Sequence, residues 1–220
     1  MAVRLERHLS SWLGRWPPVL GQVTVVGSAR REEPGWDGRV QVFAGVATPD
    51  GSVLSVPPGL EGPVRSLGQD LDEIAPRLGE ALGHPESRLG RGKFRWCASP
   101  ADLGEVGEWI EPSDDRVPDW LRPFNGEVLI AWDDTGRYAS GVGRKRHDRW
   151  GQELAVATEE NMRGRGLAPM LVAQAARRVL AEGAVPTYLH AYDNLASDKV
   201  ARVSGFPDSG WQVLGLWGPA

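Results

Sequence analysis

The stretch ELAVATEENMRGRGLAPMLVAQAARRVL, residues 153–180, contains the pattern that decides the fold of this chain. Its first six residues alternate in the manner of a strand, and apolar residues at helical spacing predict a helix from residue 167 to about 182, ended near Gly183. Between the two lies RGRG, which contributes nothing to an apolar stripe. The sequence therefore predicts a strand, a glycine-rich loop and a helix in direct succession.

The loop has the chemistry of an anion site. The first turn of a helix leaves N–H donors without backbone partners, and the helix dipole places partial positive charge there. Gly164 and Gly166 allow close approach of the backbone to a ligand, and Arg163 and Arg165 add positive charge, so a diphosphate fits. A tight turn with solvent-facing arginines explains the tetrapeptide equally well. Because no GK[ST] and no G-x-G-x-x-G follows the strand, a P-loop or Rossmann site is disfavoured.

Bulk composition narrows the class of partner. The chain has 220 residues, 41% of them hydrophobic, with a net charge of −4 and a pI near 5.6. Such a balance gives no general attraction to nucleic acid or anionic lipid, so a small anion met by a local cluster is favoured. No secretory h-region and no long apolar run are present, which predicts a cytoplasmic protein that does not cross a membrane. The one cysteine, Cys97, is expected to be a core residue.

The N-terminal part reads as a separate α/β subdomain over residues 1–90. An amphipathic helix is expected over residues 5–16, strands over 22–28 and 39–48, a hairpin turn at 49–52, and helical spacing over 64–82 that Pro76 interrupts. A polar, breaker-rich segment at 83–92 marks the boundary. The hairpins around residues 49–52 and 133–136 have a similar strand-turn-strand pattern, so a degenerate duplication of the second domain is one interpretation of the first.

Residues 91–220 are expected to form the second domain, with a mixed α/β sheet. The expected elements are a strand at 93–99, short helices or turns at 101–110 and 117–124, strands at 126–132, 137–147 and 151–158, the helix after residue 167, a strand at 187–192, a helix at 195–203 and a last strand at 211–217.

Over residues 91–216 the sequence resembles the Gcn5-related N-acetyltransferases (the GNAT superfamily), which transfer an acyl group from acyl-coenzyme A to amines. RGRGLA at 163–168 matches the R/Q-x-x-G-x-G/A pyrophosphate loop of that family, Asn194 with Ser197 matches its N-x-A-S, and Gly205 and Phe206 match its G-F. The resemblance implies the GNAT fold, with the N-terminal subdomain as an addition that shapes the acceptor cleft or forms a dimer contact.

The resemblance also implies roles for particular positions. The strand before the loop would bind the pantetheine arm of acetyl-CoA through its backbone, the loop would bind the pyrophosphate, and the start of the later helix would lie near the pantetheine. The cofactor-binding positions are Val156, Ala157, Thr158, Arg163, Gly164, Arg165, Gly166, Leu167, Ala168, Asn194 and Ser197.

Two positions depart from the family pattern. Glu160 stands where the family often has proline, and Ala201 stands where it often has the tyrosine that protonates the leaving thiolate. That acid is therefore missing or comes from elsewhere, and Tyr188 and Tyr192 are the available phenols.

Catalysis needs a neutral amine, although only roughly one in 10³ lysine-like amines is neutral at pH 7. Glu153 is the first candidate for the base, with burial expected to raise its pKa, and a solvated edge glutamate is the alternative. His147 could serve the same purpose. His190 and Tyr192 are candidates for binding the acceptor. No HExxH and no cysteine cluster is present, so no metal is expected.

Together these features predict an acetyl-CoA-dependent N-acetyltransferase in which a primary amine of a small molecule or peptide attacks the thioester directly. The backbone N–H near Val156 is expected to stabilise the oxyanion. A noncatalytic acyl-CoA sensor or assembly subunit is the alternative, and Ala201 favours it. A nucleotide-binding module is a third interpretation, which predicts that ATP or NAD competes with CoA.

Overall fold

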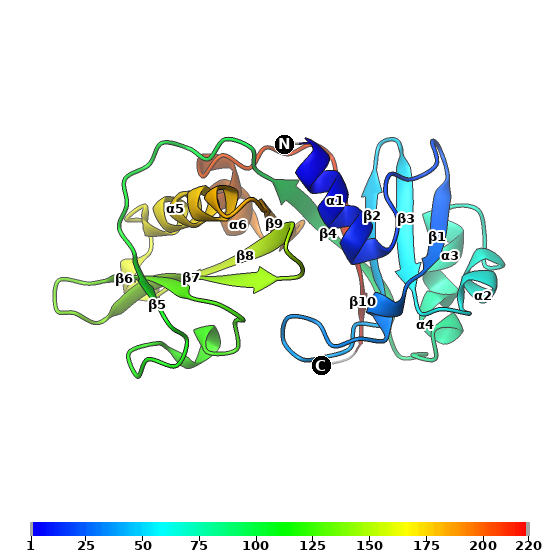
Figure 1. Cartoon of the computed structure of the whole chain (residues 1–220), viewed down its shortest axis with the longest axis horizontal. Helices are drawn as coiled ribbons and strands as arrows, with labels where there is room; N and C mark the ends of the chain where they lie inside the picture. Colours follow the sequence, from blue (N-terminus) through cyan, green and yellow to red (C-terminus); the bar gives the residue numbers. More distant parts are fainter. Residues whose placement is uncertain (1, 219–220) are drawn as a thin grey trace. The chain divides into compact units, whose positions relative to one another are not determined.

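The computed structural model describes residues 2–218 and divides into two compact units (Figure 1). Unit 1 comprises residues 3–5 and 95–208, and unit 2 comprises residues 2, 6–94 and 209–218. The sequence-based division at residue 90 differs from these units in the placement of the last strand, β10 (Gln212–Trp217), which pairs with strands of unit 2. That pairing is long-range, so local sequence patterns do not reveal it.

Unit 2 contains a mixed sheet. Its strand order is β1-β3-β2-β10-β4, with β1 (Val23–Gly27) parallel to β3 (Gly51–Val56) and the other neighbours antiparallel. The predicted hairpin is present as β2 (Ala44–Thr48) and β3. The chain passes from this unit into unit 1 within β4 (Arg88–Trp96).

The helices of unit 2 are short. The segment with helical spacing breaks into α2 (Glu61–Arg65), α3 (Leu71–Ile74), η2 (Ala75–Arg77) and α4 (Leu78–Ala81). The helical structure is broken at residues 66–70, where the Asp70 side chain caps α3, whereas Pro76 lies in the 3-10 turn η2 that joins α3 to α4 without a gap. Val64, Ile74 and Leu78 pack in one apolar cluster with sheet residues such as Leu54. The predicted amphipathic helix is present as α1 (Ala2–Leu13), but it ends before Gly14, which has a φ of +91°, and not at Trp16; η1 (Ala29–Arg31) follows β1.

Unit 1 also has a mixed arrangement of parallel and antiparallel strands. Its strand order is β9-β8-β7-β6-β5, formed by β9 (Val185–Ala191), β8 (Gly151–Thr158), β7 (Tyr138–Arg146), β6 (Val128–Trp132) and β5 (Glu108–Ile110). Strands β8 and β9 are parallel, whereas β5 to β8 form an antiparallel series.

Two helices pack against this sheet (Figure 1). Apolar residues of α5 (Leu167–Ala181) and α6 (Leu195–Val203) join Leu129, Val142 and Leu154 of the strands in one buried cluster. Burial of about 25 cal/mol per Å² of apolar surface makes this cluster the main support of the unit. The predicted strand-loop-helix order around residue 163 is confirmed.

The sequence predicts a short helix or a turn at 101–110, and the prediction of a helix is wrong. It runs extended into β5, because side chains of α5 satisfy its backbone groups. Gln174 accepts from the N–H groups of Val106 and Gly107 at 3.2 and 3.0 Å and donates to the Gly107 carbonyl. Arg177 donates to two further carbonyls of the segment. The remaining short elements are η3 (Asp119–Leu121) and η4 (Glu160–Met162).

None of the helices within residues 2–218 combines the length and the apolar character that a bilayer-spanning helix needs.

Candidate functional site

The two parallel strands of unit 1 separate part of the way along their length. Strands β8 and β9 are in register at Gly151 with Val185, at Gln152 with Pro186 and at Glu153 with Thr187, while β8 continues to Thr158. On its other side β8 stays paired with β7 up to Thr158. One edge of β8 is therefore no longer paired with β9 beyond Glu153.

The hydrogen-bonding pattern shows which backbone groups this edge offers. The Glu159 N–H donates to the Ala139 carbonyl at 2.9 Å, which places residue 159 among those that bond to β7. Because bonding alternates along an antiparallel pair, residues 155 and 157 also point toward β7. The N–H and C=O groups of Val156 and Thr158 consequently point toward the gap, where an extended ligand can pair with them, although the Thr158 carbonyl already accepts from Arg163 Nε at 3.5 Å.

The glycine-rich loop adopts a conformation that only glycine takes readily. Gly164 and Gly166 have φ of +78° and +80°, and Gly166 is the left-handed N-cap of α5. A Cβ at either glycine would meet nothing within 4 Å, so neither is required by packing against the protein. No side chain caps the helix at Gly166, which leaves its first-turn N–H groups available to an anion.

A pocket of about 780 Å³ joins these features within unit 1. Its lining consists of residues 156–158 of β8, 162–164 and 166–169 of the loop and α5, Tyr188 of β9, and Asn194, Ala196, Ser197, Lys199, Val200 and Val203 of α6 and the position before it. The structure thus brings together all the sequence-predicted cofactor-binding positions except Arg165. The predicted site residues did not include Met162, Pro169, Ala196, Lys199, Val200 and Val203, although the helical spacing of 196, 200 and 203 could have identified part of them, and Tyr188 was named only as an available phenol.

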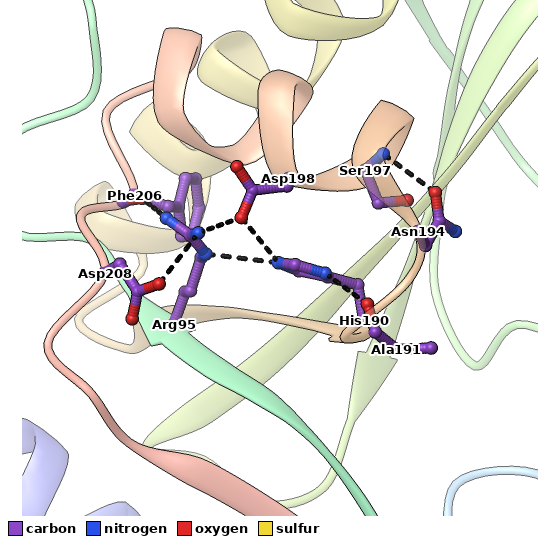
Figure 2. A network of polar contacts seen from close by, with 8 residues as sticks. All are labelled: Arg95, His190, Ala191, Asn194, Ser197, Asp198, Phe206 and Asp208. Carbon is purple, nitrogen blue, oxygen red and sulfur yellow. Dashed lines mark hydrogen bonds and ion pairs between the residues drawn. The ribbon is translucent and has the colours of Figure 1, made fainter.

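The start of α6 is fixed by a side-chain cap. The side-chain oxygen Oδ1 of Asn194 accepts from the backbone N–H of Ser197 at 3.0 Å (Figure 2). Such a cap contributes typically about 1 kcal/mol to the stability of a helix. Asn194 therefore orients the part of α6 that lines the pocket.

A buried arginine ties α6 to the neighbouring strands (Figure 2). Arg95 of β4 has a side chain only 3% exposed and donates to Asp198 at 2.5 Å, to Asp208 at 3.3 Å and to the Phe206 carbonyl at 3.0 Å. Its Nε donates to His190 Nε2 at 3.2 Å. The guanidinium thereby connects β4, β9, α6 and the segment after α6.

His190 belongs to this network and is not a lining residue of the pocket. Its Nε2 accepts from Arg95, and its Nδ1 donates to the Ala191 carbonyl at 2.9 Å. Both ring nitrogens are engaged within this network, which accounts for the burial of His190, and its role in binding an acceptor stays a prediction. Tyr192, the second acceptor candidate, is 47% exposed and also lies outside the lining.

The two candidate bases form a buried charged cluster with Lys145. Glu153 accepts from Lys145 Nζ at 2.5 Å and lies 3.3 Å from His147 Nε2. Burial alone would raise the pKa of Glu153, but the His147 hydrogen bond and the charges of Lys145 and His147 outweigh it and lower that pKa. The expectation of a raised pKa is therefore wrong. Neither residue lines the pocket, and their catalytic role stays a prediction.

The Glu153 cluster predicts a pH-dependent contribution to stability. A carboxyl whose folded pKa lies below its unfolded value of about 4.3 stabilises the fold above that pH, and the contribution disappears as the pH falls through the folded pKa. Glu153→Gln should therefore lower the unfolding free energy by about 1–3 kcal/mol at pH 7, since it removes the ionised acceptor of the Lys145 hydrogen bond and of the contact with His147. The deficit should shrink below about pH 4. Urea unfolding at several pH values measures it.

Glu105→Gln provides the control for this measurement. The Glu105 side chain is 68% exposed and pairs with Arg177 at 3.5 Å. Removal of its charge should therefore change the unfolding free energy by less than about 1 kcal/mol at both pH 7 and pH 3.5. A deficit for Glu153→Gln that stays equal from pH 7 to pH 3.5 would show that the carboxylate charge contributes nothing.

Cys97 is a core residue, as the sequence predicts. Its side chain is fully buried in the cluster of unit 1, and burial raises the pKa of the thiol to about 11, with a backbone hydrogen bond from Ser99 acting in the opposite direction. A thiol with that pKa supplies almost no thiolate at neutral pH.

Solved structures of other proteins are similar to this chain. A protein from Novosphingobium aromaticivorans assigned to the GNAT acetyltransferase family superposes with a TM-score of 0.51 at 21% identity, over 62% of this chain and 69% of that one. A GCN5-related N-acetyltransferase from Kribbella flavida matches with a TM-score of 0.46 at 16% identity, over 68% and 66%. The first of these shows that the fold is shared. No curated protein matches the chain.

The family model described as "Acetyltransferase (GNAT) family" matches residues 94–206, which are half of the chain and include the split strands, the glycine-rich loop and α6. The chain belongs to the GNAT acetyltransferase family.

Proposed function

We propose that this protein binds acetyl-CoA in the pocket of unit 1 and transfers the acetyl group to a primary amine of a small molecule or peptide by direct attack. The observation that carries the proposal is the continuity of the pocket. It joins the unpaired edge of β8, the left-handed glycines before α5 and the capped start of α6 in one space of about 780 Å³. That volume is within the range of sites for cofactor-sized ligands.

Each part of the pocket matches a part of acetyl-CoA. The N–H groups after Gly164 and the positive end of α5 suit the diphosphate, and Arg163 in the lining adds charge. The amide-containing pantetheine arm can pair with the backbone of Val156 and Thr158 as an additional strand would. The acetyl group then lies toward the point where β8 and β9 separate, beyond Glu153 and Thr187.

The chemistry at that point requires donors for the thioester oxygen. The Val156 N–H is directed into the gap, where it can stabilise the oxyanion of the tetrahedral intermediate. An amine must lose a proton as the amide forms, and Glu153, at the last register pair of β8 and β9, stays the predicted acceptor of that proton together with His147. Its lowered pKa keeps it ionised at neutral pH.

A noncatalytic acyl-CoA sensor is the second candidate, and the alanine at position 201 favours it. Release of CoA from acetyl-CoA, measured with a panel of amines that includes a peptide N-terminus and an aminoglycoside, distinguishes the two. We expect turnover with at least one amine and a decrease at neutral pH in Glu153→Gln that alkaline pH partly reverses. Binding of acetyl-CoA without turnover for every amine would favour the sensor.

A further inference from the structure

The pocket contains one phenol, and its position suits a proton donor. Tyr188 follows Thr187, the last β9 residue in register with β8, so it lies where the two strands begin to separate. Among the described residues it is the only member of β9 in the pocket lining. The ring therefore reaches the pocket from the end at which the thioester of a bound acetyl-CoA would lie.

Contacts on several sides hold this phenol in place. Its hydroxyl is hydrogen-bonded to the side chain of Ser197, which also lines the pocket. The ring packs against His190 at 6.1 Å and Phe206 at 5.8 Å between ring centroids. Because His190 is itself fixed by Arg95, the phenol has a defined orientation before any ligand binds.

The neighbouring helix has room for the phenol. Ala201 lies one turn after Ser197 on α6, is fully buried and belongs to the same apolar cluster as Tyr188 and Phe206. Its methyl group leaves no competing polar group in that cluster. Lys199, which lies on α6, is another pocket-lining side chain that can donate a proton, and it is exposed to solvent.

We infer that Tyr188 donates the proton that the CoA thiolate receives when it leaves. This inference rests on the proposed function. As the tetrahedral intermediate collapses, the C–S bond breaks with its electron pair on sulfur, and the Tyr188 O–H proton transfers to that sulfur to give the thiol of CoA. The phenolate regains a proton from solvent, and Glu153, the proposed acceptor of the proton lost by the amine nitrogen, releases that proton to solvent, so the protons balance. The net reaction converts an amine and acetyl-CoA into an acetamide and CoA.

The electrostatics of the site fit this role. Burial raises the pKa of Tyr188 and keeps the phenol protonated at neutral pH, while the Ser197 hydrogen bond and the nearby charge of Arg95 act in the opposite direction and favour release of the proton. A phenol that donates a hydrogen bond to sulfur stabilises the thiolate form over the thiol form.

A titration that needs no acceptor tests the inference. We measure the affinities for CoA and for desulfo-CoA from pH 6.5 to pH 9.5 in three proteins: wild type, Tyr188→Phe and Tyr138→Phe. If Tyr188 donates to sulfur, the thiol of bound CoA has a lower pKa than the thiol of free CoA. The affinity of wild type for CoA relative to desulfo-CoA should then rise about tenfold across this range, as expected for a hydrogen bond to a charged group.

The variants separate the possible results. Tyr188→Phe should show a flat ratio of the two affinities while still binding desulfo-CoA, and Tyr138→Phe, which removes another half-buried phenol outside the lining, should behave as wild type. A rise that persists in Tyr188→Phe, or a flat ratio in wild type, overturns the inference and leaves the proposed function intact. Failure of wild type to bind either ligand overturns the proposed function instead. With an acceptor in hand, Tyr188→Phe should lower kcat about 10²-fold at unchanged affinity for desulfo-CoA.

Discussion

Replacing Gly164 and Gly166 together by alanine is expected to weaken binding of acetyl-CoA by about 100-fold. Both residues have positive φ, which an alanine adopts only at a cost of about 1–2 kcal/mol each. The loop relieves that strain by rotating its peptide groups, and the N–H donors then no longer converge on the diphosphate. Loss of one or two hydrogen bonds to a charged group accounts for the expected factor. Isothermal titration with acetyl-CoA measures it.

A matched pair of glycines separates strain from binding. Gly136 and Gly183 also have positive φ, of +77° and +87°, and a Cβ at either would meet nothing within 4 Å. Both lie in unit 1 outside the pocket lining. The Gly136→Ala and Gly183→Ala double variant should lose similar stability and bind acetyl-CoA within about twofold of wild type. Equal affinities in the two double variants would show that the loop backbone does not hold the ligand.

Arg95→Met is expected to lower the local unfolding free energy of β9 and α6 by about 3–5 kcal/mol. Methionine fills most of the space of the arginine stem, but Asp198 and the ring of His190 lose the cation that they share in a buried setting. Removal of one partner from a buried ion pair has this magnitude, because the remaining charge is left without compensation. Hydrogen exchange of amides in residues 185–203 measures the loss within unit 1.

Arg91→Met on the same strand gives the comparison. Arg91 pairs with Asp72 at 2.6 Å, but the Asp72 side chain is 89% exposed. Exposed pairs contribute between about 0 and 1 kcal/mol, so little change in stability is expected. If Arg95→Met were as mild as Arg91→Met, the network around His190 would have no role in positioning α6.

The sequence predicted the part of the fold in which local pattern and chemistry coincide. The alternation in β8, the glycines before α5 and the Asn194 cap are each readable from a few consecutive residues, and the structure gathers them around one pocket. These features depend on backbone conformation and helix ends, which short motifs specify.

Long-range contacts explain what the sequence did not predict. Glu153 has a lowered pKa because the hydrogen bond with His147 and the charge of Lys145, which β7 places directly across from it, outweigh burial; that arrangement is not visible in the sequence of either strand. His190 is fixed by Arg95, which lies 95 positions earlier in the chain. The segment at 101–110 stays extended because Gln174, far along the chain, satisfies its backbone groups.

The central claim is that backbone amides at the start of α5 hold the diphosphate of acetyl-CoA. Calorimetric titration of wild type with acetyl-CoA, in competition with ATP and NAD, tests it most directly. We predict saturable binding of one acetyl-CoA per chain that ATP and NAD at equal concentration do not displace, and a rise in thermal unfolding temperature with ligand concentration. Absence of both heat and thermal shift with acetyl-CoA, or displacement by NAD, would contradict the claim.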